Sequence, residues 1–212
     1  MIHEVSKIKE VSKQMNNNSF DPDKRIESNQ TLEKKKCETY DPDKRIDYYT
    51  PLKKRIDLTP KENSPHGYWA GERGKSPFSP DTDTDDSRKA RKCLEKFGQK
   101  DISFKDGYPD FSKVTYESVE IENMTDKIFE NFKQADTACA KKWNEQLKDG
   151  RSDWKLSDVK KFRTDNNLTW HEHQNLKTCQ LVDRSIHKVC RHAGGRMEYK
   201  ARHHIKEGGF DE

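Results

Sequence analysis

The chain has 212 residues, of which 29% are hydrophobic, and its 42 Lys or Arg against 38 Asp or Glu give a net charge of +4. This length suits one catalytic domain and a modest extra segment, since domains typically have about 100–200 residues. The low apolar content excludes one tightly packed core over the whole chain. No run approaches the roughly 20 apolar residues of a membrane-spanning helix, so we expect no membrane partner.

Two further features of the composition bear on function. The five cysteines are odd in number and show no CxxC spacing, which predicts ordinary reduced thiols. Residues 151–212 hold 13 Lys or Arg against 9 Asp or Glu, whereas residues 1–150 hold 29 of each. All the excess positive charge therefore sits near the C-terminus, where it permits binding to a phosphate backbone without demanding it.

A repeat marks the N-terminal part of the chain. The sequence of residues 20–26 recurs almost unchanged at residues 40–46, and residues 54–57 echo it a third time. Asp-Pro-Asp favours a turn, and the residue before proline avoids the helical region. Each copy is therefore predicted to be a turn followed by a short, charged, extended piece. We interpret residues 1–65 as an extended linker and residues 66–212 as the functional domain.

Three helices are predicted before the C-terminal region. Residues 67–114 are rich in Gly, Pro and Asp, which indicates loops with fixed turns, but within them residues 87–97 form an amphipathic helix capped by Ser87. In residues 126–148 the apolar side chains follow steps of three and four, which predicts a helix with one buried face. Ser157 is expected to cap a third, short helix that ends near Asn166.

A hairpin and a helix follow. Residues 168–174 alternate like a strand, with Thr169, His171 and His173 on one side and Glu172 on the other. Residues 175–177 are a plausible turn, and residues 178–182 form a second strand. Asp183 is placed to cap a helix over residues 184–191, which Gly194 and Gly195 end.

Four histidines gather in this unit: His171, His173, His187 and His192 fall within 22 positions of a chain that has eight. A neutral imidazole binds zinc or nickel, and a carboxylate such as Glu172 admits magnesium or manganese. A metal at the edge of such a pocket leaves open positions for a phosphate oxygen.

Hydrolysis of a phosphodiester needs a base for water, a cation to offset charge on phosphorus, and help for the leaving oxygen. A strand histidine suits the first requirement, and a metal supplies the other two. Nearby basic residues would hold the flanking phosphates without reading sequence; they are Lys177, Arg184, Lys188, Arg191 and Arg196.

At these residues the chain resembles a known family. Trp170-His-Glu-His173, with His187, His192 and Gly194-Gly195 after it, is similar to the tryptophan-His-His branch of the HNH/endonuclease VII superfamily, and residues 71–76 and 106–111 resemble upstream segments more weakly. The resemblance implies an α+β chain, with a mainly helical region and a C-terminal ββα-metal (His-Me finger) motif at about residues 168–195. Residues 1–65 would be a linker or pre-toxin segment, and residues 66–212 the nuclease domain of a bacterial polymorphic toxin.

The resemblance further implies cleavage of DNA, with RNA less expected, that depends on one divalent ion (Zn, Mg, Mn or Ni). It favours His173 as general base, although His171 as base stays open. The ligands would be His187 and His192 of the helix, with His171 or Glu172 completing the shell; strand geometry favours His171. A toxin of this kind is secreted or delivered into the cytoplasm of a target cell, and its producer needs a cognate immunity protein.

Two departures and two alternatives stay open. His187 and His192 are five apart, about 140° around a helix, so they converge only if the helix ends before His192 and the Gly194-Gly195 turn folds it back. The turn at Asn175-Leu176 lacks the glycine that tight turns prefer. One alternative is a closed structural zinc shell of His187, His192, Cys179 and Cys190. The other is a DNA-binding module without catalysis.

Overall fold

In the computed structural model of this chain, the described residues are 48–81 and 84–204. They fall within one of the two units into which the chain divides, Arg45–Glu212. The repeats at residues 20–26 and 40–46 lie outside the described residues, as does Cys37. Helices and small antiparallel sheets make up the described part, so the fold class is α+β, as the sequence predicts.

A three-stranded antiparallel sheet contains the predicted hairpin. The hairpin strands are β6 (Leu168–Glu172) and β7 (Thr178–Asp183), which pair from Leu168 opposite Asp183 to Glu172 opposite Cys179. A third strand, β5 (Glu117–Glu120), pairs with the other edge of β7. The strand order β5-β7-β6 leaves β6 at an edge of the sheet. The predicted hairpin is confirmed, whereas β5 was not predicted.

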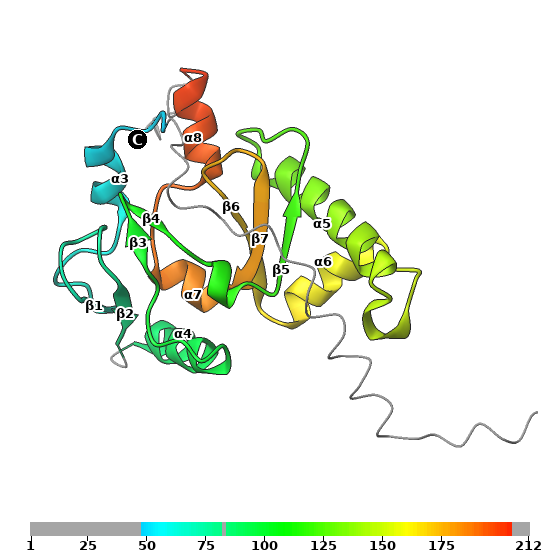
Figure 1. Ribbon diagram of the computed structural model, residues 1–212, viewed down its shortest axis with the longest axis horizontal. Coiled ribbons are helices and arrows are strands. Elements are labelled where there is room, and N and C mark those ends of the chain that lie inside the picture. The colour runs from blue at the N-terminus through cyan, green and yellow to red at the C-terminus, as the bar shows by residue number, and fades with distance from the viewer. Residues whose placement is uncertain (1–47, 82–83, 205–212) are drawn as a thin grey trace, which may run out of the picture. The chain divides into compact units, whose positions relative to one another are not determined.

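Each face of the sheet is covered by a pair of helices (Figure 1). Cys179 and Leu181 of β7 point into one hydrophobic core, which α5 (Ile128–Glu145) and α6 (Leu156–Asp165) complete. Val182 points to the opposite core, formed with α4 (Asp85–Lys96) and α7 (Arg184–Val189). The alternation of side chains along one strand therefore ties two cores together.

The three predicted helices are present, but two caps differ. The N-cap of α4 is Thr84, whose hydroxyl accepts a hydrogen bond from the backbone N–H of Ser87, so the predicted cap residue lies in the first turn. In α6, Ser157 is likewise inside the helix, and the carboxylate of Asp158 accepts from the backbone N–H of Lys155. Sequence alone does not decide which of several polar residues near a helix start makes the capping bond, because more than one side chain there can accept from a free N–H.

Several short elements were not predicted. Within the predicted loops lie two small hairpins, β1 (Gly67–Trp69) with β2 (Phe78–Pro80) and β3 (Phe104–Lys105) with β4 (Tyr108–Pro109). There are also the 3-10 turns η1 (Ser112–Val114) and η2 (Lys148–Gly150), and two helices, α3 (Leu52–Leu58) and α8 (Gly195–Arg202). None of the described helices is both long enough and apolar enough to cross a membrane.

Helix α3 contradicts the extended structure predicted for the third repeat copy. Its residue Arg55 is buried, lies 4.4 Å from the ring centroid of Tyr48 and 5.2 Å from that of Tyr108, and donates to the carbonyl oxygen of Asp106. Gly107 makes room for it, since a Cβ there would lie 2.8 Å from the Cβ of Arg55. Contacts with distant residues therefore override the local preference of this charged segment.

A buried carboxylate joins the sheet to two helices. Asp136 of α5 accepts two hydrogen bonds from the guanidinium of Arg163 in α6, at 2.7 and 2.8 Å. It also accepts one from the indole N–H of Trp170 in β6, at 2.8 Å. All three side chains are nearly inaccessible to solvent. The bidentate geometry satisfies the buried charges, which are costly to leave unpaired.

We predict that Asp136→Asn lowers the free energy of unfolding by about 3–5 kcal/mol, because it leaves the buried guanidinium of Arg163 without a counter-charge. Asp165→Asn is the matched control, since its ion pair with Lys161 is exposed and such pairs contribute little. Urea unfolding followed by circular dichroism measures both. Equal effects of the two substitutions would show that the buried network adds nothing beyond an ordinary surface pair.

Candidate active site

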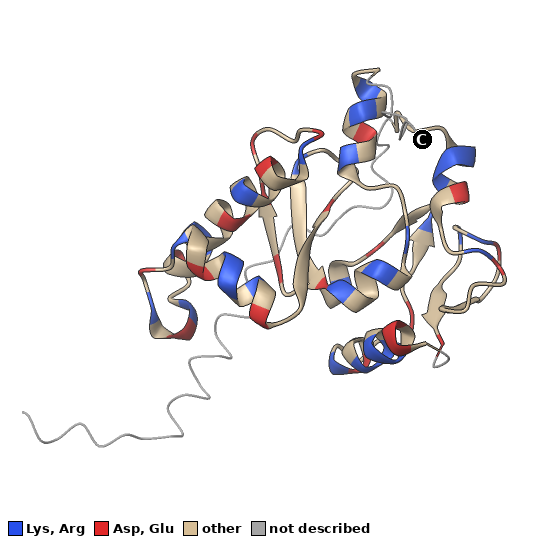
Figure 2. Ribbon diagram, turned by 180° about the vertical axis from the view of Figure 1, so that it is seen from behind, with Lys and Arg blue, Asp and Glu red and all other residues tan. Residues whose placement is uncertain are grey.

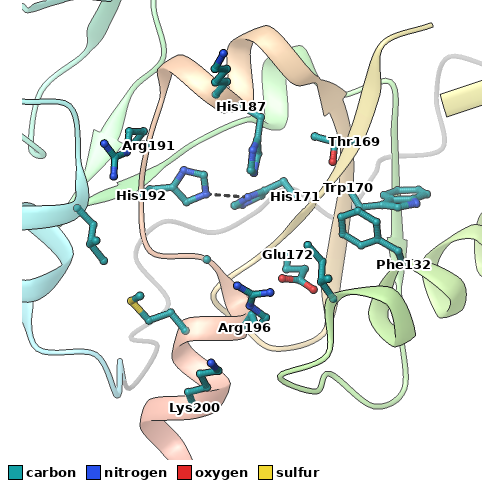
Figure 3. Close-up of a pocket in the computed structure, with 15 residues that line it drawn as sticks. Phe132, Thr169, Trp170, His171, Glu172, His187, Arg191, His192, Arg196 and Lys200 are labelled. Carbon is teal, nitrogen blue, oxygen red and sulfur yellow. Dashed lines mark hydrogen bonds between the residues drawn. The ribbon is translucent and has the colours of Figure 1, made fainter. Parts of the chain in front are cut away.

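Three histidines from separate segments converge beside β6. His171 lies on β6, His187 on α7, and His192 on the segment that follows α7 (Figure 3). One nitrogen from each lies within 4.8 Å of the other two. Nδ1 of His171 and Nε2 of His192 are 3.1 Å apart. A metal site at these residues requires that His171, His187 and His192 come together, and the structure brings them together.

The end of α7 brings the helix pair together. The helix stops at Val189, two residues earlier than predicted, and Cys190 leaves it with a ψ of 57°. His192 consequently lies outside the helix, which removes the 140° separation that five helical residues would impose. Beyond it, Gly194 and Gly195 pass close to the hairpin and open α8. The prediction that the helix must end before His192, which follows from the five-residue spacing, is confirmed.

A backbone carbonyl fixes the proton on His192. The carbonyl oxygen of Cys190 lies 2.6 Å from Nδ1 of His192, and an oxygen of this kind can only accept, so Nδ1 carries the proton. In the neutral ring the lone pair is then on Nε2, which faces His171. Partners of this kind are the usual means of orienting a metal-binding imidazole.

The three rings are neutral at physiological pH. Burial lowers the pKa of His187 to about 3 and that of His192 to about 4. Burial also holds the pKa of His171 well below its usual value, and the neighbouring His192 and His187 lower it further. Because the charged forms are disfavoured, each ring keeps a lone pair available for a metal.

The residues present fit a divalent metal ion. Two ligand nitrogens of a tetrahedral ion, each at about 2.05 Å, lie about 3.3 Å apart, close to the observed 3.1 Å between His171 and His192. Three imidazoles also leave a further coordination position open, as in catalytic rather than structural sites.

Glu172 and His173, both predicted site residues, lie outside this cluster. Oε1 of Glu172 accepts a hydrogen bond of 2.7 Å from the amide of Asn131. Burial raises the pKa of Glu172, although that bond and the nearby Arg196 oppose the increase. Nδ1 of His173 accepts from the backbone N–H of Asn175 at 3.2 Å, and burial lowers the pKa of this ring.

The turn between the strands explains how the hairpin closes without glycine. Leu176 takes up the left-handed region, with a φ of 62°, which costs a non-glycine residue about 1–2 kcal/mol. The side-chain oxygen of Asn175 accepts from the backbone N–H groups of Lys177 and Thr178, at 3.0 and 2.9 Å. This Asx-type turn offsets the cost of the left-handed residue.

A pocket of about 700 Å³ contains the three imidazoles. Of the five basic residues predicted to hold phosphates, Lys188, Arg191 and Arg196 line it, and Lys200 of α8 joins them. Lys and Arg are spread along α7 and α8 (Figure 2). Lys177 instead pairs with Glu120 at the hairpin end, and Arg184 donates to the carbonyl oxygen of Leu168. These two predicted residues do not line the pocket.

The cysteines do not support a closed zinc shell. Cys179 lies in the core under α5, and Cys190 in the core under α4. Among the described residues, the metal-binding cluster contains neither thiol. Burial raises the pKa of both thiols, which disfavours the thiolate that zinc would need.

Comparison with known families agrees with the geometry. Residues 101–194 match the family described as the DNase/tRNase domain of colicin-like bacteriocin. The matched residues are fewer than half of the chain, but they include all three clustered histidines. The match supports a nuclease domain of bacteriocin type with a nucleic acid as substrate. The comparison with curated proteins gives no match.

We predict that Gly195→Ala lowers the free energy of unfolding by about 1–3 kcal/mol, as overpacking does. A Cβ on Gly195 would lie 2.5 Å from the carbonyl oxygen of His173 and 3.2 Å from backbone atoms of Glu172. Gly71→Ala is the control, because the nearest atom to its Cβ would be 3.4 Å away in the side chain of Ser76. Chemical denaturation compares them, and unchanged stability of Gly195→Ala would show that the hairpin yields easily there.

Proposed function

We propose that the chain is a metal-dependent endonuclease that hydrolyses phosphodiester bonds of DNA and acts as an antibacterial toxin. The observation that carries the proposal is the convergence of three neutral imidazoles in a pocket edged by Lys and Arg. His171, His187 and His192 would hold one divalent ion. Of the four candidates Zn, Mg, Mn and Ni, imidazole ligands favour Zn and Ni.

The chemistry of DNA fits such a site. DNA lacks the 2′-hydroxyl that RNA offers as an internal nucleophile, so its hydrolysis requires an external water. A bound divalent ion lowers the pKa of water and offsets the charge that develops on the phosphate. The chain's own residues supply the rest: Lys188, Arg191, Arg196 and Lys200 surround the pocket and can hold phosphates on either side of the cleaved bond.

The toxin role rests on the family match. A nuclease domain of bacteriocin type is expected in a secreted or delivered effector that acts in the cytoplasm of a target cell. A cell that makes such a nuclease needs a cognate immunity protein. The basic residues at the pocket would favour an acidic inhibitor, because complementary charge speeds association and selects the partner.

Plasmid cleavage tests the metal-dependent site. We expect a chelator to abolish cleavage, and His187→Ala and His192→Ala each to reduce it by about 100-fold or more, since a metal supplies several kcal/mol of transition-state stabilisation. Adding back Zn²⁺, Mg²⁺, Mn²⁺ or Ni²⁺ singly identifies the working ion. His203→Ala is the matched control, since His203 is exposed on the end of α8 and bonds only locally.

Two outcomes would overturn the proposal. Cleavage that persists at full rate in chelator, or in both pocket variants, excludes a role for the imidazole cluster. If none of the four metals supports cleavage and zinc copurifies at one per chain, the structural zinc site is the better interpretation.

Binding measurements separate the predicted phosphate contacts. We expect Arg191→Ala to weaken binding of the metal-free protein to a DNA duplex. The slope of the logarithm of the binding constant against the logarithm of salt concentration should become shallower by about one, as loss of one phosphate contact predicts. Lys177→Ala should leave both unchanged, because Lys177 pairs with Glu120 away from the pocket. Fluorescence anisotropy over a series of salt concentrations measures both. Equal losses in the two variants would extend the DNA path to the hairpin turn.

A further inference from the structure

Among the described residues, Glu172 is the one acidic residue that lines the pocket of the three imidazoles. It follows His171 directly in β6, and side chains of successive strand residues point to opposite faces. Both nevertheless reach the pocket because β6 is the edge strand and the pocket runs along its outer side, where Thr169 and Trp170 line it too. In Figure 3 the carboxyl group of Glu172 points into this space near Arg196.

The position of this carboxylate is set from α5. The amide NH₂ of Asn131 donates to Oε1 of Glu172 at 2.7 Å and to the carbonyl oxygen of Thr125 at 2.8 Å. The amide oxygen of Asn131 accepts from the backbone N–H of Thr125 at 2.9 Å, which fixes which end of the amide faces Glu172. An amide held on both sides orients one oxygen of the carboxylate and leaves the other, Oε2, to the pocket.

Glu172 does not belong to the metal cluster. The cluster joins nitrogens of His171, His187 and His192 that lie within 4.8 Å of one another, and it does not include Glu172. His173, which the resemblance favours as the base, is not among the residues that line the pocket. Its Nδ1 is turned to the backbone of Asn175. The ring centroid of His173 lies 6.2 Å from that of His171, but of the two residues that follow His171 only Glu172 lines the pocket.

We infer that Glu172 is the general base that activates the attacking water, an inference that rests on the proposed nuclease function. Its carboxylate takes one proton from the water, whose oxygen forms a bond to phosphorus while the bond from phosphorus to the 3′ oxygen breaks. The leaving oxygen takes a proton from solvent, and Glu172 returns its proton to solvent. The products are a 5′-phosphate and a 3′-hydroxyl.

The test measures cleavage, metal affinity and DNA affinity on the same full-length variants. For Glu172→Gln we expect the single-turnover rate to fall by about 100-fold or more, as loss of a general base predicts. Affinity for Zn²⁺, measured by calorimetry, and for DNA should change less than about threefold, because the variant keeps the imidazoles and the bond to Asn131. His173→Gln should cleave at close to the wild-type rate. Glu130→Gln, an exposed position on α5, is the control for loss of a negative charge.

The outcomes distinguish this inference from the proposed function. If the wild-type protein cleaves and Glu172→Gln cleaves equally well, the inference fails while the nuclease stands. A loss of Zn²⁺ affinity in parallel with activity would make Glu172 a ligand instead, and a large loss in His173→Gln alone would restore His173 as base. If circular dichroism shows that Glu172→Gln does not fold, Glu172→Asp decides: a reduced rate at unchanged Zn²⁺ affinity supports the inference, and an unchanged rate overturns it.

Discussion

The site depends first on the position of β6, and a single buried carboxylate ties this strand to two helices. Asp136 binds the guanidinium of Arg163 and the indole of Trp170, so α5, α6 and β6 meet at one point. Trp170 is the residue directly before His171. A buried ion pair gains little net stability over a well-packed apolar group, but separating its partners leaves an uncompensated buried charge. The network therefore acts on the register of the strand that carries the first histidine.

The positions of His187 and His192 are set by the local structure around them. His187 and His192 meet because α7 stops at Val189, and because α8 begins against the carbonyl oxygen of His173. The arrangement buries His171, leaves His187 and His192 half-buried, and brings one nitrogen of each ring within 4.8 Å of the others. An ion held by all three rings would bind only the folded chain, so binding of a metal should stabilise the fold.

The sequence predicted the parts of the fold that have a strong periodic pattern. The hairpin β6-β7 and helix α5 follow from alternation and from steps of three and four. Helix α3 and strand β5 do not, because their few buried side chains, such as Arg55 and Val119, are fixed by distant residues. The clustered histidines could be predicted from their number and spacing. The place of Glu172 could not, since only the edge position of β6 brings both faces of the strand to one pocket.

The histidine cluster and part of its pocket wall come from different parts of the chain. The matched residues 101–194 contain all three clustered histidines and Glu172. Leu58 of α3 and Arg196, Met197 and Lys200 of α8 also line the pocket, and they lie outside the match. The buried carboxylate of Glu198 in α8 accepts from the backbone N–H groups of Tyr49 and Thr50, which lead into α3, and from the hydroxyl of Tyr108 in β4. The pocket is thus lined partly by residues within the match, the three histidines among them, and partly by two helices outside it.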